Sequence, residues 1–544
     1  MNLGALKAHL VLLFLAVAPS GAYAGAGLPS TCERPVAGSV VAPPPDLYSQ
    51  GGVLNVDLTY NTTVDADNRT LFCFNTRNGL ESPTLHVKPG DTLNIALTNR
   101  VPALPAGSPA EPVPNSCGAK SMTGTSVNMH FHGTNTSPTC HSDEVVHTLI
   151  NSGETFHYSV TFPKDEPPGL YWYHPHVHGI AEAAALGGGT GLIVVEGIEN
   201  LQPAVANLPE RLLVIRDQNV ASNPNPGGQV PSWDISLNYV PISYPALTPA
   251  VIQIAPGAQE FWRVANASAD TIADLQLVYD GVPQPLQIVA LDGVPTGSQD
   301  GTRRGKMVAA TDAFIPPAGR AEFIMAAPPA NVKTANLITN KIETGPDGDN
   351  DTRRVLAVLI SPNVADDHKS NGVAMATLPA PSVTPGPQRF ESLDRATVTT
   401  RRRLYFSEVL QDPTNPSGPT NFYITVDGAT PTLFSASNPP AITTTQGAVE
   451  EWTIENRARE NHEFHLHQIH FQLRERNGVQ VSGDERQFYD TIQVPYWSGK
   501  GPYPSVTVAL DFRGNVVGDF VYHCHILGHE DSGMMATIRV LPQS

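Results

Sequence analysis

The chain has 544 residues, a length that predicts about three domains rather than one. Apolar residues make up 40% and charged residues 15%, so each domain can bury a core of its own. The formal net charge of −18 argues against nucleic acid and anionic membranes as partners. The 45 glycines and 50 prolines follow no collagen-like period, and this composition favours many short strands joined by turns.

Residues 1–24 have the features of an export signal. Lys7 supplies a positive charge, a short apolar run follows at 10–18, and Ala-Tyr-Ala at 22–24 matches a signal cleavage site. An uncleaved N-terminal anchor is the alternative, and the shortness of the apolar run argues against it. No later apolar run reaches the ~18 residues that span a bilayer. We therefore expect an exported protein, periplasmic or extracellular, without a membrane span.

The five cysteines divide into a group of four and one that stands apart. Cys32, Cys73, Cys117 and Cys140 lie near the N-terminus, whereas Cys524 lies between two histidines. Four cysteines allow three pairings and the sequence does not choose among them. We favour Cys32–Cys73 with Cys117–Cys140, which leaves Cys524 for a metal.

One internal repeat organises the chain. Segments 85–99, 252–266 and 442–456 each begin near a glycine turn and end on an asparagine nine positions after that glycine. Apolar and polar residues alternate between the two, which is the period of a half-buried strand. Three copies so far apart predict three similar domains rather than a short-period repeat.

The rest of the sequence also predicts strands, and no segment shows a sustained helical stripe. Four β-branched runs are bounded by turn residues, namely 190–197, 211–217, 354–360 and 505–512. The predicted fold class is all-β, with each unit a two-sheet antiparallel sandwich of roughly 150 residues. Boundaries are expected near residue 200 and in the proline-rich stretch 377–387. The predicted domains are 25–200, 201–385 and 386–544.

Histidines concentrate in four short clusters. The clusters are His130 and His132; His174, His176 and His178; His462, His465, His467 and His470; and His523, His525 and His529. On a strand, residues i and i+2 face the same side, so each His-x-His pattern presents two imidazoles together. In His-Cys-His the same alternation sends Cys524 to the opposite face. One short strand can therefore serve two different metal sites.

The residue types around Cys524 point to copper. One thiolate with two imidazoles and a weak thioether is the ligand set of blue-copper electron-transfer sites. His529 follows Cys524 by five positions and Met534 by ten, the spacing of a loop that folds back over one metal. Six to eight further imidazoles imply a metal cluster. Structural zinc often uses paired cysteines, and no C-x-x-C is present.

Four motifs carry a specific family resemblance. They are HFHG (130–133), WYHPHVHG (172–179), HEFHLH (462–467) and HCHILGHEDSGMM (523–535). These resemble the four copper-binding motifs of the multicopper oxidases. The last is similar to that of bacterial spore-coat laccases, and the second to that of bacterial copper-efflux oxidases. The resemblance covers essentially the whole mature chain, and it implies three cupredoxin domains, each a Greek-key β-sandwich.

The resemblance implies four copper ions per chain and assigns their ligands. The type 1 copper would take His462, Cys524 and His529, with Met534 as weak axial ligand and Met535 as its rival. The type 2 copper would take His130 and His465. One type 3 copper would take His132, His174 and His525, and the other His176, His467 and His523. His178 and His470 match no ligand position. Glu463 stands where the commoner H-P-x-H-x-H motif has proline, a departure expected to affect loop geometry alone.

The implied activity is that of a laccase-like oxidase. Such an enzyme couples one-electron oxidation of a small reductant, a phenol or aromatic amine, to four-electron reduction of dioxygen to water. Glu530 and Asp143 match the family's proton-relay positions, and a solvated surface acid is the alternative interpretation of each. The identity of the reductant and the oligomeric state stay open.

Other functions on the same scaffold are weighed against this one. A metal-ion oxidase, for Fe(II) or Cu(I), or a bilirubin-type oxidase is the alternative. The eight methionines form no Met-rich insert, which argues against a dedicated cuprous oxidase. Iron oxidation would need an acidic site beside the type 1 copper, and no single carboxylate cluster in the sequence indicates one. The complete ligand set argues against a copper-free binding protein, and the three-domain length argues against a copper nitrite reductase.

Overall fold

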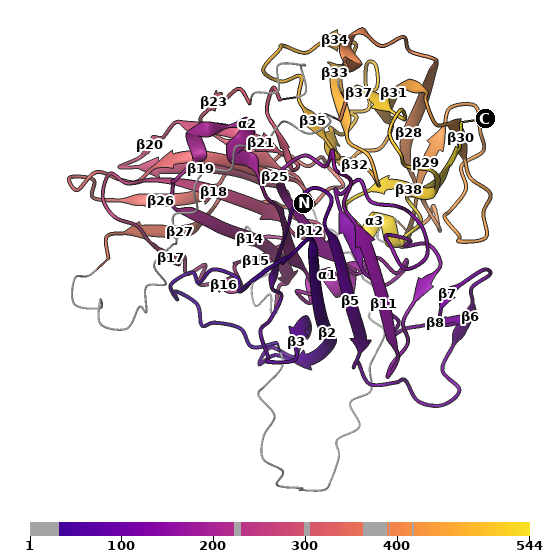
Figure 1. Ribbon diagram of the computed structural model, residues 1–544, viewed down its shortest axis with the longest axis horizontal. Coiled ribbons are helices and arrows are strands. Elements are labelled where there is room, and N and C mark those ends of the chain that lie inside the picture. Colours follow the sequence, from indigo (N-terminus) through magenta and orange to yellow (C-terminus); the bar gives the residue numbers. More distant parts are fainter. Residues whose placement is uncertain are drawn as a thin grey trace, which may run out of the picture.

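A computed structural model describes residues 32–221, 230–298, 305–362, 389–390, 392–415 and 418–543. The predicted signal segment and the predicted boundary at 385/386 lie outside the described residues. Strands make up 45% of the structure and helices 4%, which confirms the all-β prediction. Figure 1 shows three bodies of packed strands that follow one another along the chain. The boundary near residue 200 stays a prediction.

The first body pairs a five-stranded sheet, β1-β4-β13-β12-β9, with a four-stranded sheet, β11-β5-β2-β3. Its strands are β1 (Asp46–Tyr48), β2 (Val53–Val64), β3 (Thr70–Thr76), β4 (Thr84–Val87), β5 (Thr92–Asn99), β9 (His130–His132), β11 (Thr155–Thr161), β12 (Gly169–His174) and β13 (Gly191–Val195). Two small two-stranded sheets extend it, formed by β6 (Ala110–Pro112) with β8 (Ser121–Thr123), and by β7 (Cys117–Gly118) with β10 (Thr148–Leu149).

The second body pairs two larger sheets. One has the order β16-β15-β14-β18-β25-β21-β22 with β23 on β21, and the other β17-β27-β26-β19-β20 with β24 on β19. The strands are β14 (Glu210–Asn219), β15 (Trp233–Leu237), β16 (Val240–Ile242), β17 (Ala250–Gln253), β18 (Gln259–Asn266), β19 (Ala273–Tyr279), β20 (Val282–Pro283), β21 (Leu286–Leu291), β22 (Val294–Pro295), β23 (Val308–Ala310), β24 (Ala313–Ile315), β25 (Arg320–Ala326), β26 (Ala335–Thr339) and β27 (Arg354–Ile360).

The third body, orange to yellow in Figure 1, pairs β29-β28-β31-β37-β33-β34, with β35 on β33, and β30-β39-β38-β32-β36. The strands are β28 (Thr400–Leu410), β29 (Thr420–Val426), β30 (Ile442–Thr445), β31 (Val449–Asn456), β32 (His462–Leu466), β33 (Phe471–Arg476), β34 (Val479–Gln480), β35 (Phe488–Tyr489), β36 (Thr491–Val494), β37 (Ser505–Asp511), β38 (Gly518–Cys524) and β39 (Met535–Leu541).

The described residues also include a few short helices. They are α1 (Ala181–Leu186), α2 (Ile198–Leu201) and α3 (Leu527–Asp531), with 3₁₀ turns η1 (Pro203–Val205) and η2 (Leu393–Arg395). The carboxylate of Asp531 in α3 accepts hydrogen bonds from the N–H groups of Gly179 and Glu182, at 2.6 and 2.9 Å, and so ties the third body to α1 of the first. None of the helices that the structure describes is long and apolar enough to cross a membrane.

The sequence repeat has a clear structural role in the third body. Gly447 adopts a φ of 96°, which glycine allows without strain, and β31 follows that turn. At the end of β31, Asn456 Nδ2 donates to the carbonyls of Glu460 and Val494, at 2.8 and 3.0 Å. Asn99 and Asn266 make equivalent pairs of bonds in the other two bodies. In the third body this bracing fixes the entry into β32, which begins at His462.

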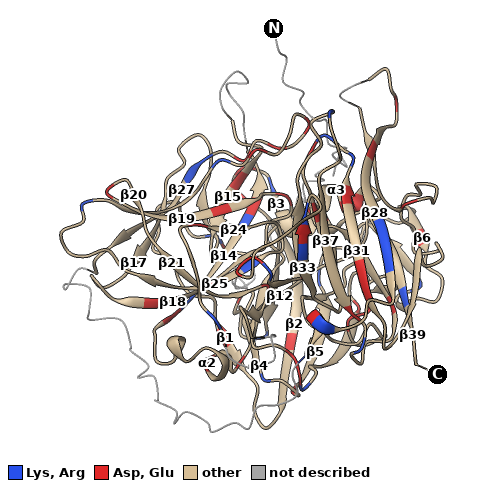
Figure 2. Cartoon of the chain, turned by 90° about the horizontal axis from the view of Figure 1, so that it is seen from above, with Lys and Arg blue, Asp and Glu red and all other residues tan. Residues whose placement is uncertain are grey.

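Two disulfides join Cys32 to Cys73 and Cys117 to Cys140, the pairing favoured from the sequence. Cys524 is buried and is the one free thiol among the described residues. Figure 2 shows that basic and acidic positions are interspersed along the strands.

Candidate metal centre

The first group of candidate ligands gathers around Cys524. His462 begins β32, Cys524 ends the neighbouring strand β38, and His529 lies in α3. The Sγ atom lies 3.6 Å from His462 Nδ1 and 3.7 Å from His529 Nδ1, and the two nitrogens are 3.1 Å apart. All three side chains are buried. One thiol and two imidazoles therefore converge on a single point.

The segment after Cys524 folds back as its spacing predicts. The N–H of Cys524 donates to the carbonyl of Met534 at 3.1 Å, and the N–H of Met534 donates to that of His529 at 3.0 Å. Met534 is fully buried in the same core cluster as Cys524. Met535 packs in a different cluster, with Val145 of the first body. This placement favours Met534 over Met535 as the thioether beside the thiol.

Eight further histidines meet between the first and third bodies. They form three buried groups within which the ligand atoms lie no more than 4.8 Å apart: His130, His132 and His465; His132, His174 and His525; and His176, His467 and His523. The Nε2 atom of His523 is 3.3 Å from that of His176 and 3.1 Å from that of His467. Strand pairing produces this arrangement, because His130 lies opposite His174 and His465 lies opposite His523.

Burial keeps seven of these imidazoles neutral. It lowers the pKa of His523 to about 3. Burial first, and neighbouring imidazoles second, hold the pKa values of six others well below the usual range: His132, His174, His176, His465, His467 and His525. A neutral imidazole offers a nitrogen lone pair, which is the form that binds a metal.

Unpartnered ring nitrogens show that these side chains fit a bound copper ion. Several buried ring nitrogens have no hydrogen-bond partner: His130 Nε2, His132 Nδ1, His174 Nε2, His465 Nε2, His467 Nδ1 and both nitrogens of His525. Each such group costs about 1–3 kcal/mol if it stays unsatisfied. Coordination of a metal removes that cost, and many imidazoles with one thiolate suit copper.

Three carboxylates lie around the histidines and contact their ring nitrogens. Asp143 Oδ1 lies 2.9 Å from His130 Nδ1, and Gln468 Nε2 donates to Asp143 Oδ2 at 2.6 Å. Asp490 Oδ1 lies 3.1 Å from His132 Nε2. Contacts of this kind fix the tautomer and orientation of a metal-binding imidazole.

The third carboxylate, Glu530, is fully buried beside the histidines. Its Oε2 lies 3.2 Å from His523 Nδ1, and its Oε1 lies 3.6 Å from His176 Nδ1. Burial raises the pKa of Glu530 well above its usual range, with a smaller contribution from Asp531. Glu530 and Asp143 are therefore both buried, and the surface-acid interpretation of each is wrong.

The second body also reaches the histidines, which sequence reasoning missed. Arg320, at the start of β25, donates to Asp490 at 2.8 and 2.5 Å. The N–H of Asp490 donates to Asp292 at 3.1 Å, and His470 Nε2 lies 2.7 Å from the carbonyl of Asp292. His470 is thus part of the scaffold between the second and third bodies. His178 packs edge-on against Phe434, and burial lowers the pKa of its ring to about 4.

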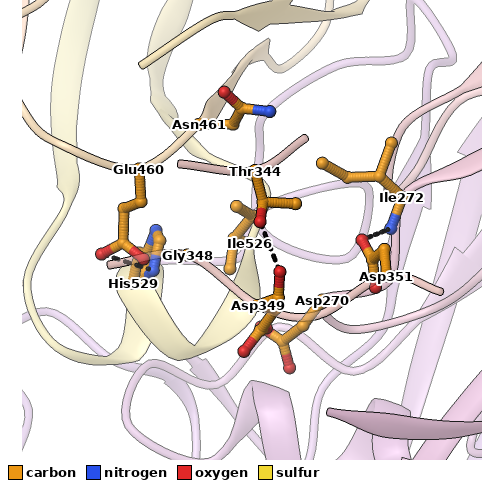
Figure 3. Close-up of a pocket in the computed structure, with 10 residues that line it drawn as sticks. All are labelled: Asp270, Ile272, Thr344, Gly348, Asp349, Asp351, Glu460, Asn461, Ile526 and His529. Atoms are coloured by element: carbon orange, nitrogen blue, oxygen red, sulfur yellow. Dashed lines mark hydrogen bonds and ion pairs between the residues drawn. The ribbon is translucent and has the colours of Figure 1, made fainter. Parts of the chain in front are cut away.

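An acidic pocket lies beside His529, at the junction of the second and third bodies. It is lined by Asp270, Ile272, Thr344, Gly348, Asp349, Asp351, Glu460, Asn461, Ile526 and His529. Figure 3 shows Glu460 against His529, and Asp270 beside Asp349. Glu460 Oε1 lies 3.5 Å from His529 Nε2. No single carboxylate cluster in the sequence indicated this pocket, because Asp270, Asp351 and Glu460 come from separate segments of the chain.

These carboxylates repel one another. Burial, and then Glu182, Asp217 and Asp349, raise the pKa of Asp270 well above its usual range. Burial and Asp349 raise that of Asp351 to about 8. Asp270 Oδ2 and Asp351 Oδ1 are buried without a hydrogen-bond partner. A cation would relieve this repulsion. Only the acid-rich run 347–351 hinted at the pocket, because its other members come from distant segments.

Comparisons with known proteins agree with the assignment of these residues as a copper centre. Two family models described as "Multicopper oxidase" match residues 121–200 and 413–544. "Multicopper oxidase LPR1 homolog 1" of Oryza sativa subsp. japonica is 23% identical over 87% of this chain and 85% of its own. "Multicopper oxidase mco" of Staphylococcus aureus is 34% identical over 17% of this chain and 20% of its own.

Solved structures share the fold. A "metallo-oxidase" multicopper oxidase from Campylobacter jejuni superposes with a TM-score of 0.65 at 21% identity, covering 94% of this chain and 96% of its own. The multicopper oxidase McoA of Aquifex aeolicus, as its 2F4 variant, gives a TM-score of 0.65 at 18% identity, over 92% and 99%. These are cupredoxin-fold proteins, as the resemblance implied. The chain belongs to the multicopper oxidase family, whose members are copper-dependent oxidoreductases that use dioxygen.

Proposed function

We propose that the chain binds four copper ions and oxidises a small reductant at a site beside His529. The convergence of eleven buried histidine and cysteine side chains in four groups supports this. The type 1 copper would be held by His462, Cys524 and His529, with Met534 as weak axial ligand. The type 2 copper would be held by His130 and His465. The two type 3 coppers would be held by His132, His174 and His525, and by His176, His467 and His523.

When bound, the coppers supply the one-electron oxidation of the reductant and the four-electron reduction of dioxygen to water. The chain's own residues connect and supply these sites. Cys524 is covalently joined to His523 and His525, so a short backbone path links the thiol to the histidine cluster. Glu530 holds a proton next to His523, and Asp143 orients His130. We assign proton supply to Glu530 and Asp143 on these contacts.

The acidic pocket favours a cationic reductant, and the best supported substrate is a metal ion such as Fe(II). The single observation that carries this choice is the set of four carboxylates, Asp270, Asp349, Asp351 and Glu460, that line one pocket together with His529. Hard divalent cations prefer carboxylate oxygens. An electron entering there would reach His529 directly. Among the similar structures are the Campylobacter jejuni metallo-oxidase and Fet3p, which functions in iron import.

Laccase-type oxidation of phenols or aromatic amines is the second candidate. Phe422 stacks on His529 with ring centroids 4.2 Å apart, so the imidazole that lines the pocket already packs against an aromatic ring. A laccase-like multicopper oxidase from Ochrobactrum is among the similar structures. An aromatic amine in its cationic form would satisfy both the stacking and the acidic lining. We also propose export of the chain, supported by its two disulfides, which persist in oxidising compartments.

The test compares Fe(II) and a neutral phenol as reductants of the copper-loaded protein. We expect Asp349→Asn to lower the ratio of kcat/KM for Fe(II) to kcat/KM for the phenol about tenfold, because one full charge leaves the pocket. Asp347→Asn is the matched control, since Asp347 is 52% exposed, lies outside the pocket and pairs with Arg459. An equal ratio in the wild type and both variants would refute a metal-ion substrate at this pocket.

A further inference from the structure

Glu463, the residue that replaces the proline of the commoner motif, contacts the thiol of Cys524. It lies in β32 directly after His462 and is fully buried. Its backbone N–H donates to Cys524 Sγ at 3.4 Å. Proline has no N–H, so a chain with proline at this position cannot make the bond. The departure from the motif therefore changes the surroundings of the sulfur, and not loop geometry alone as expected from the sequence.

The hydrogen bonding of β32 leaves this N–H to the sulfur. The carbonyl of Glu463 accepts from the N–H of His525 at 2.8 Å, which joins β32 to the end of β38. The N–H of Glu463 also points toward β38, but it donates to Cys524 Sγ instead of to a backbone carbonyl. Burial raises the pKa of the thiol well above its usual range, and hydrogen bonds from the backbone of Glu463 and of Ile526 oppose that rise. Two backbone donors thus face one buried sulfur.

We propose that the Glu463 N–H raises the reduction potential of the Cys524 copper site, which makes residue 463 a tuning position of this chain. This inference rests on the proposed type 1 ligands. A hydrogen bond draws charge from the thiolate and stabilises it more when the metal is reduced, because the sulfur then carries more negative charge. Hydrogen bonding around the cysteine sulfur is one of the means by which such potentials are set.

The side chain of Glu463 provides a matched control. Its Oε1 accepts from Gln493 Nε2 at 3.0 Å, away from the sulfur bond. Glu463→Gln keeps the backbone N–H, the volume and a polar partner for Gln493. Glu463→Pro removes the N–H, and it takes no backbone–backbone bond from the sheet because this N–H donates to sulfur. The two variants therefore differ in the N–H to sulfur and in the side-chain partner of Gln493, which lies away from the sulfur.

The measurement is the reduction potential of the blue site in the copper-loaded protein, by titration against a mediator. Glu463→Pro should keep the blue absorption and shift the electron-exchange equilibrium constant about tenfold toward the oxidised site, or about 59 mV for one electron. Glu463→Gln should shift it by less than about threefold. Equal potentials in the two variants, or a higher one in Glu463→Pro, would overturn the inference.

A second measurement needs no variant. In wild-type protein labelled with ¹⁵N-glutamate, pulsed EPR of the oxidised blue site should detect coupling to the Glu463 nitrogen, which lies one hydrogen bond from the sulfur. A spectrum without that coupling would overturn the inference even if Glu463→Pro failed to fold. A wild-type protein without blue absorption would instead overturn the proposed ligands themselves, and this inference with them.

Discussion

Arg320→Leu tests whether the second body, which holds none of the proposed copper ligands, stabilises the fold beside the histidines through its buried ion pair with Asp490. The Arg320 guanidinium is fully buried and donates hydrogen bonds to both carboxylate oxygens of Asp490. Asp490 in turn lies 3.1 Å from His132. Leucine has a similar apolar stem but no charge, so the substitution leaves Asp490 and Asp292 as buried acids without their cation.

The structure allows an estimate of the cost. Breaking a buried ion pair by removing one partner costs about 3–5 kcal/mol, because the remaining charge stays desolvated. Arg401→Leu is the matched control: its Nε lies 2.8 Å from Glu451, but Arg401 is 71% exposed. Exposed pairs contribute about 0–1 kcal/mol. The two variants remove the same group from pairs of similar length and differ in burial.

The assay is guanidinium unfolding of the copper-free variants at two pH values. Burial and Asp490 already raise the pKa of Asp292 to about 7, against the pull of Arg320. Loss of Arg320 raises this folded-state pKa further. An acid whose pKa is higher in the folded state than in the unfolded state stabilises the folded state at low pH. This contribution to the unfolding free energy is lost as the pH rises through the folded-state pKa. The loss of unfolding free energy in Arg320→Leu, relative to the wild type, should therefore be larger at pH 8 than at pH 5.5. Equal destabilisation by Arg320→Leu and Arg401→Leu would refute the reasoning.

Other substitutions probe the centre and the fold. Cys524→Ser should abolish the blue absorption and the oxidation of every substrate, with circular dichroism unchanged, because the thiolate gives the site its colour; a retained blue band would contradict the assignment. Met534→Leu should raise the type 1 potential with copper still bound, since only a weak bond is lost; an unchanged potential would point to Met535 or to no axial sulfur. Glu530→Gln should leave anaerobic reduction by the substrate normal and slow reoxidation by dioxygen about 10²–10⁴-fold in stopped-flow experiments; equal loss in both half-reactions would make the residue structural. Replacing both Cys117 and Cys140 with alanine should lower the unfolding free energy by about 3 kcal/mol, because their disulfide closes a loop that limits the freedom of the unfolded chain. An unchanged unfolding free energy would contradict this explanation.

Local patterns in the sequence predicted strands and ligand pairs well. The runs 190–197, 211–217, 354–360 and 505–512 correspond to β13, β14, β27 and β37. Two-residue alternation in His-x-His correctly placed imidazoles on shared faces, since β geometry depends only on neighbouring residues. The pairing of cysteines close in sequence was also confirmed.

What escaped prediction depends on which strands and loops become neighbours. Arg320 and Asp490 are 170 positions apart, and each alone looks like an ordinary charged residue in a strand-rich region. The acidic pocket draws on Asp270, Asp351 and Glu460, which meet only when the second and third bodies pack together. The role of Glu463 lies in its backbone N–H, which no side-chain pattern reports. Each case requires tertiary structure.

The central claim is that four groups of buried side chains hold four copper ions that together reduce dioxygen to water. The most direct test measures copper per chain by elemental analysis and, on the same sample, the electrons consumed per dioxygen. We predict four copper ions per chain and four electrons per dioxygen, without released peroxide. A fully loaded protein that holds one copper ion, or that releases hydrogen peroxide in proportion to the dioxygen consumed, would contradict the account.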